Sequence, residues 1–164
     1  MADELRLISA AVIAPAEALE IVRPLLGAEP VDGGLARDRH RLTAYARGVD
    51  HDDAETVTDY GVPDARLMLV VRFTPTADNS PPDDPHGDNT LRDILTTVLA
   101  LIRTTAADAV LTCTDDIVLR HHGGRTALEP TWPGWTEIPT LRDIPAQHRT
   151  NTTNHPRDDP PADP

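Results

Sequence analysis

The chain has 164 residues, a formal net charge of −12 and a single cysteine, and only 3% of its residues are aromatic. One cysteine excludes an internal disulfide and a cysteine-based zinc site, and the negative charge disfavours binding to nucleic acid or to an anionic membrane. No apolar run approaches the about 20 residues that span a bilayer, and the first six residues do not begin a signal peptide. We therefore expect a cytoplasmic protein with one domain over residues 1–145 and a disordered tail over residues 146–164.

The first predicted elements are a strand over residues 5–12 and a helix over residues 15–26. Pro15 suits the first turn of a helix, and Glu17 favours the positive end of the helix dipole. The apolar residues that follow recur at helical spacing. Pro24 removes a helical hydrogen bond, so we expect it to kink the helix or end it near Val22.

Strands are predicted on both sides of an acidic stretch. Residues 35–38 and 41–48 follow a turn signal and form either a hairpin or one long strand that is broken at residues 37–41. Residues 65–74 are almost continuously apolar, which is typical of a central strand that is covered on both faces.

The stretch from residue 89 to residue 130 organises the rest of the chain. A strongly amphipathic helix is predicted over residues 90–104, with Thr90 as its N-cap and Asp93 supporting the cap. Strands over residues 108–114, 117–122 and 125–129 follow, and Gly123-Gly124 suits a tight hairpin turn. These elements predict an α+β fold, with a mostly antiparallel sheet of about six strands and two main helices on one face, in the order β-α-β-β-β-α-β-β-β.

Negative charge is concentrated in two short segments. Residues 50–64 contain six acids and residues 76–89 contain four aspartates, and neither segment has an arginine. Such segments would steer a basic partner, although polar loops also collect aspartate without a function. We expect residues 76–89 to form a mobile loop, and the two segments to begin at opposite ends of the sheet. The candidate partner-binding acids are Asp50, Asp52, Asp53, Glu55, Asp59, Asp83 and Asp84.

The remaining candidates are two aromatic and two imidazole side chains. Trp132 and Trp135 flank a Pro-Gly pair and serve either as packing residues or as anchors of an interface. His121 and His122 are consecutive strand residues, so they point to opposite faces and cannot both bind one metal ion. The sequence contains no recognisable catalytic constellation, and we expect no cofactor and no metal.

The predicted helix and the strands after it also carry a family resemblance. The run LRDILTTVLALIR at residues 91–103, DAVL at 108–111 and IVLRHHGGR at 117–125 resemble the C-terminal half of the Sit-type immunity proteins, which protect bacteria from swarming-inhibition toxins delivered to neighbouring cells. Where that family often has a large apolar residue after its DAVL-like strand, this chain has Thr112, Cys113 and Thr114. The resemblance implies a non-enzymatic protein that binds and neutralises a cognate toxin, and the acidic segments imply a basic surface on that toxin. The alternative is an adaptor that binds another protein of a bacterial secretion or biosynthetic locus.

Overall fold

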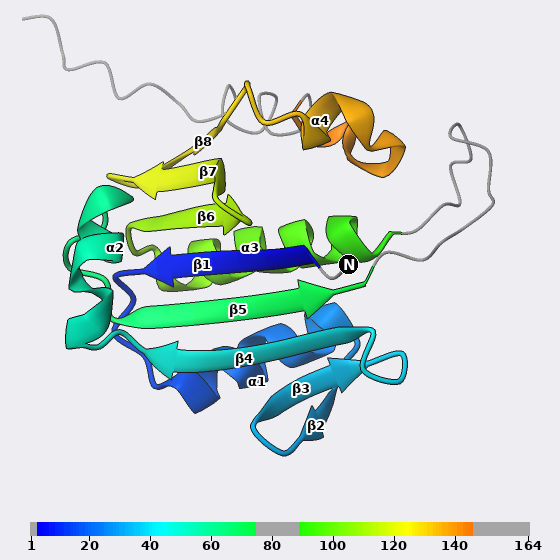
Figure 1. The fold of residues 1–164 in the computed structure, drawn as a ribbon, viewed down its shortest axis with the longest axis horizontal. Helices are drawn as coiled ribbons and strands as arrows, with labels where there is room; N and C mark the ends of the chain where they lie inside the picture. The colour runs from blue at the N-terminus through cyan, green and yellow to red at the C-terminus, as the bar shows by residue number, and fades with distance from the viewer. Residues whose placement is uncertain (1–2, 75–88, 146–164) are drawn as a thin grey trace, which may run out of the picture.

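The computed structural model describes residues 3–74 and 89–145, which form eight strands and six helical segments (Figure 1). In chain order these are β1 (Asp3–Ser9), α1 (Pro15–Leu26), β2 (Glu29–Val31), β3 (Gly34–Arg37), β4 (Leu42–Gly48), the 3₁₀ helix η1 (His51–Asp53), α2 (Ala54–Asp59), β5 (Leu67–Phe73), α3 (Thr90–Thr105), β6 (Ala109–Cys113), β7 (Asp116–His122), β8 (Arg125–Leu128), α4 (Gly134–Glu137) and the 3₁₀ helix η2 (Pro139–Leu141).

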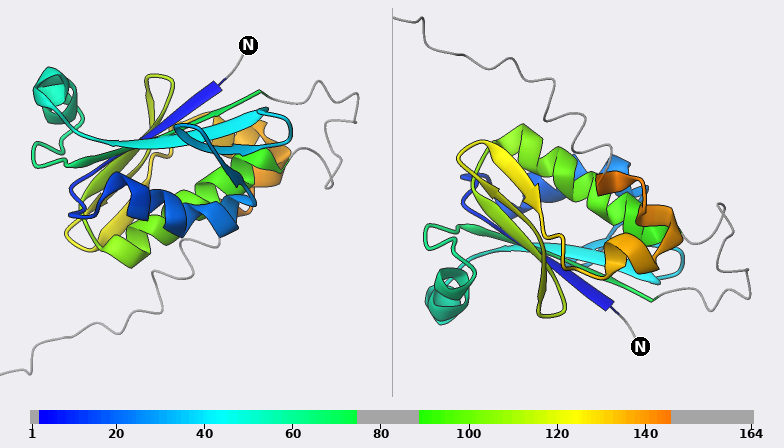
Figure 2. Two further views of the ribbon diagram at one scale, coloured as in Figure 1. Left: turned by 90° about the horizontal axis from the view of Figure 1, so that it is seen from below. Right: turned by 90° about the horizontal axis from the view of Figure 1, so that it is seen from above.

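All eight strands belong to one antiparallel sheet in the order β2-β3-β4-β5-β1-β6-β7-β8. The helices α1 and α3 lie on one face of this sheet, and α2 lies on the other face at one end (Figure 2). The predicted α+β class, the antiparallel sheet and the two main helices on one face are confirmed. The sheet has eight strands rather than about six.

The main core lies between the sheet and the helices α1 and α3. Alternating residues such as Leu5 and Leu7 of β1 point into it, where they meet fully buried residues of α3 such as Leu95 and Val98. Every residue of the central strand β5 except Arg72 is buried, and these residues lie on both faces of the sheet, as the continuous apolar run predicts. Its residues Met68 and Val70 belong to a second, smaller cluster on the opposite face.

The edge strand β2 and its hairpin were not predicted. Val31 pairs with Gly34 across a two-residue turn in which Gly33 has a φ of 81°, a left-handed conformation that glycine adopts without strain. Pro30 lies inside β2 and is tolerated there because an edge strand leaves one side of its backbone unpaired. The strand has only three residues, too few to produce a recognisable alternation.

The open question over residues 35–48 is answered by a hairpin. Arg37 pairs with Leu42, and the loop between them is turned by three successive residues with positive φ, Asp38, Arg39 and His40. At the far end of the sheet, Gly123 and Gly124 have φ values of 57° and 77°, so the predicted glycine turn is confirmed.

The two main helices have the predicted bounds to within one residue. Pro24 does not end helix α1 near Val22, because it lies in the last turn: the helix continues to Leu26 and ends at the left-handed Gly27. Helix α3 begins at Thr90 with Asn89 at the N-cap position and has no side-chain cap. The expected capping partners instead accept hydrogen bonds from the Arg37 guanidinium, at 3.3 Å to Thr90 Oγ1 and 3.1 Å to Asp93 Oδ2.

The expected loop over residues 76–88 and the expected tail over residues 146–164 lie outside the described residues. The strand β5 joins the two acidic segments, with residue 66 at one end of the sheet and residue 74 at the other (Figure 1).

Candidate partner-binding surface

The first acidic segment, residues 50–64, forms a compact structure after β4. The Asp50 carboxylate accepts a hydrogen bond of 2.9 Å from the Asp52 amide, and the Asp53 carboxylate accepts one of 3.0 Å from the Asp50 amide. This reciprocal capping box starts the 3₁₀ helix η1, which leads directly into α2. The side chains of Asp50 and Asp53 therefore stabilise the local fold of the segment.

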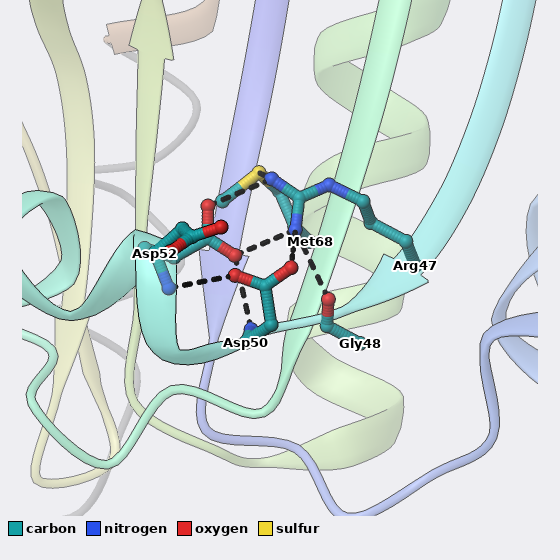
Figure 3. A network of polar contacts seen from close by, with 6 residues as sticks. Arg47, Gly48, Asp50, Asp52 and Met68 are labelled. Atoms are coloured by element: carbon teal, nitrogen blue, oxygen red, sulfur yellow. Dashed lines mark hydrogen bonds and ion pairs between the residues drawn. The ribbon is translucent and has the colours of Figure 1, made fainter.

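An arginine of β4 fixes this turn to the sheet. Arg47 makes two parallel bonds to Asp53, at 2.6 Å from Nη1 to Oδ2 and 2.8 Å from Nη2 to Oδ1. Figure 3 shows the same guanidinium reaching the Gly48 carbonyl and the sulfur of Met68. The hydrogen bonds from Arg47 hold the pKa of the Asp53 carboxyl far below its usual range, against the opposing effect of burial. Asp53 is only 15% exposed, so its charge is used inside the protein.

Apolar residues and a second arginine hold the rest of the segment. Val57 and Val62 are buried against the smaller cluster on this face of the sheet, which includes Ile8, Met68, Val70 and Val110. Arg120 of β7 donates a 2.6 Å hydrogen bond from Nη1 to the Tyr60 carbonyl. The segment is thus attached at its beginning by Arg47, in its middle by Val57 and at its end by Arg120.

The outer side of the segment carries the free negative charge. Four acids are exposed and make no ion pair within the described residues: Asp52, Glu55, Asp59 and Asp64. Asp50 is also exposed, with its carboxylate 4.0 Å from Arg47. Of the predicted acids, Asp50, Asp52, Glu55 and Asp59 are thus exposed in this segment, and so is Asp64, which was not among the predicted acids. Asp83 and Asp84 lie outside the described residues.

The two tryptophans are packing residues. Trp132 is 7% exposed and Trp135 is 5% exposed, and their rings meet edge to face with centroids 4.8 Å apart. The Trp135 indole N–H donates to the Glu129 carbonyl at 2.9 Å, and Gly134 allows the close contact because a Cβ there would overlap the Trp132 ring. Of the two predicted alternatives, this burial favours packing over an interface anchor, because little of either ring is left for a partner.

The two histidines separate as the strand alternation predicts. His121 is buried with its Nδ1 at 2.8 Å from Thr126 Oγ1, whereas His122 is exposed with its Nδ1 at 2.9 Å from Asp108 Oδ2. At the other end of β6, burial raises the pKa of the Cys113 thiol to about 11, which keeps the thiol protonated at neutral pH. In the part of the chain that the structure describes, no three His, Cys, Asp or Glu side chains are grouped to hold a metal ion.

The site and the fold define a small protein with a helix-covered core and a displayed acidic surface. Among residues 3–74 and 89–145, no helix has the length and apolarity to cross a membrane. A family model described as SitI3-like matches residues 4–139, and the chain therefore belongs to the SitI3-like family. The predicted Sit-type immunity protein is confirmed by this match.

Two further comparisons complete the picture. No curated protein matches the sequence significantly. Among solved structures, the chain is similar to a protein from the "CdiA-CT/CdiI toxin and immunity complex from Burkholderia pseudomallei", at 13% identity and a TM-score of 0.42, over 74% of this chain and 98% of that one.

Proposed function

We propose that this immunity protein is not an enzyme and neutralises its cognate toxin by binding it directly, with the exposed acids of residues 50–64 against a basic surface of the toxin. The observation that carries the proposal is the division of the acids into two groups. Asp53 forms an internal ion pair with Arg47. In contrast, four acids are exposed and unpaired within the described residues: Asp52, Glu55, Asp59 and Asp64.

The rigidity of the segment supports this function. Binding through a flexible loop loses free energy because side chains and backbone must be ordered in the complex. Here the bonds from Arg47 and Arg120 and the burial of Val57 have already ordered the backbone that carries the acids. Four like charges on a fixed surface also attract a basic protein over a distance and raise the rate of association. The cytoplasmic location stays a prediction.

Co-expression tests the function itself. Where the neighbouring upstream gene encodes a toxin with a short variable C-terminal domain, that domain is expressed alone and together with the chain, and the survival of the cells is measured. We expect survival only when both are present. Cells that die equally fast with and without the chain would refute neutralisation.

Binding kinetics test the surface. The variant with Asp52→Asn, Glu55→Gln and Asp59→Asn should associate with the toxin domain about tenfold more slowly at low salt, and its rate should depend less on salt. The matched control removes three exposed acids from other parts of the protein, Glu20→Gln, Glu29→Gln and Glu137→Gln. If the two variants slow association equally, net charge rather than this surface is responsible, and the proposed site is wrong.

A further inference from the structure

The face of the sheet that carries α2 continues beyond the acidic segment. The strand register places Thr43 of β4, Arg72 of β5 and Glu4 of β1 in one row across the sheet. The next row contains Tyr45, Val70 and Arg6, and the row after it contains Arg47, Met68 and Ile8 beneath the acidic segment. We use the name "open face" for the five residues of the first two rows that α2 leaves uncovered and that retain exposed surface: Glu4, Arg6, Thr43, Tyr45 and Arg72.

The open face has a positive charge that its own contacts hold in place. Glu4 accepts hydrogen bonds of 2.7 Å from Arg6 Nη2 and from Arg72 Nε. These bonds, chiefly the one from Arg72, lower the pKa of Glu4, so the carboxylate stays ionised between two guanidinium groups. The Arg72 guanidinium also lies over the Tyr45 ring, 5.7 Å from its centroid. Two arginines against one carboxylate leave one net positive charge at this site.

Several donors of these arginines have no acceptor among the described residues. Arg72 is 55% exposed and uses its Nε on Glu4. Arg6 is 36% exposed and uses one Nη, and its buried Nε has no hydrogen-bond partner among the described residues. An arginine that a neighbour already orients binds a carboxylate with two parallel bonds at little further loss of side-chain freedom. Arginine and tyrosine are also the residues that most often dominate the binding energy of an interface.

We propose that the open face is the second half of the toxin-binding surface and receives an acidic side chain of the toxin. This inference rests on the proposed function. Arg72 lies four residues along β5 from Met68, the residue beneath the acidic segment, which is a distance of about 13 Å. An ordinary interface covers about 800 Å² on each partner, a patch about 30 Å across. A toxin that contacts the acids from this side of the sheet therefore also covers Arg72 and Tyr45.

The chemistry of the partner follows from the two charges. The toxin presents basic residues to the acidic segment and, about 13 Å away, a carboxylate to Arg72 and Arg6. Such an arrangement fixes the orientation of the complex, because turning the toxin around would bring like charges together. A toxin with a uniformly basic surface does not fit it.

The test compares two exposed arginines on opposite faces of the sheet. Arg72→Gln and Arg103→Gln each remove one positive charge, and Arg103 lies in the last turn of α3. Binding of the purified toxin domain identified by the co-expression test is measured by calorimetry, and the melting temperature of each variant is measured alongside. We expect Arg72→Gln to weaken binding about tenfold, with Arg103→Gln changing it less than about twofold.

The possible outcomes separate this inference from the proposed function. If the unmodified chain does not bind the toxin domain, both are overturned. If the acidic variant weakens binding but Arg72→Gln does not, only the role of the open face is overturned. Light scattering tests whether the open face instead binds a second copy of the chain. The open face would be assigned to a second copy if the unmodified chain is a dimer and Arg72→Gln is a monomer with unchanged toxin affinity.

Discussion

The two faces of the sheet differ in how much of each is covered by apolar side chains. The face under α1 and α3 is closed by a continuous apolar core whose residues range from Leu5 to Ile144. The other face has a cluster of six buried residues at one end and is otherwise polar. On this second face, hydrogen bonds from Arg47 and Arg120 help to attach the acidic segment, in addition to its buried valines.

The two faces therefore contribute differently to the stability of the fold and to the recognition of a partner. A large buried core can tolerate the loss of a surface charge without any measurable effect, because most of the free energy of folding comes from burial. A surface that is held by a few charged contacts can keep its charges exposed at the cost of being less stable locally. The loss in the free energy of unfolding that a mutation causes should therefore decrease from the helix-covered core to the exposed acids.

The largest loss of stability is expected in the helix-covered core. Leu95 of α3 is fully buried, so Leu95→Ala should lower the free energy of unfolding by about 2–5 kcal/mol. Urea unfolding followed by circular dichroism measures this loss. Leu99→Ala on the same helix is the control, because Leu99 is only partly buried and should cost less. Equal losses for the two variants would contradict the assigned helix face.

A smaller loss is expected on the opposite face. Val57 is the buried residue of α2, and Val57→Ala removes two buried methyl groups, which should cost about 1–2 kcal/mol. The same change should also weaken toxin binding by loosening the acidic segment. Thr58→Ala, at an exposed neighbouring position, is the control for both measurements. A Val57→Ala protein of unchanged stability would mean that α2 is not packed as described.

The ion pair of Arg47 and Asp53 should contribute about 1 kcal/mol, because the partly exposed guanidinium is screened by solvent. The pKa of Asp53 is lower in the folded protein than in the unfolded chain, where an aspartate titrates near pH 4. The contribution is therefore present above about pH 4 and is lost as the pH falls further. Asp53→Asn should be less stable than the unmodified protein at pH 7 but equally stable in strong acid. A difference that stays constant with pH would exclude the ion pair as its cause.

The smallest effect on stability is expected at the exposed acids. Asp59→Asn should change the free energy of unfolding by less than about 0.5 kcal/mol, because Asp59 is exposed and makes no ion pair within the described residues. Its effect should appear only in the rate of toxin association. A loss comparable to that of Asp53→Asn would show that the two acids do not differ in role.

The sequence predicts most of the helix-covered face. The period of the apolar residues in α3 and the continuous run in β5 are strong signals, because burial selects side chains along a whole element. The glycines at 123 and 124 likewise indicate a turn by their backbone freedom alone. These elements are predicted with bounds within one or two residues of those in the structure.

The opposite face is much less predictable, for physical reasons. The helix α2 has six residues and buries only Val57, so it has no periodicity to detect. Asp52 and Asp53 are indistinguishable in sequence, and only the approach of Arg47 separates an exposed charge from an internal one. The prediction of Thr90 as N-cap is wrong for a similar reason. Arg37, more than fifty positions away in the chain, donates hydrogen bonds to the side-chain oxygens of Thr90 and Asp93 that were expected to cap the helix.

The bond between Arg120 and the Tyr60 carbonyl has a consequence for the order of folding. It joins positions 60 residues apart, and the acidic segment can use it only after β7 has paired with β6 and β6 with β1. Closing so long a loop costs entropy that nearby contacts must first offset. The segment should therefore become ordered after the transition state, so that Val57→Ala speeds unfolding and leaves the folding rate almost unchanged in stopped-flow experiments. A slower folding rate would instead place α2 in the folding nucleus. With an unchanged folding rate, the acidic segment would be the part of the described structure that forms last and opens first.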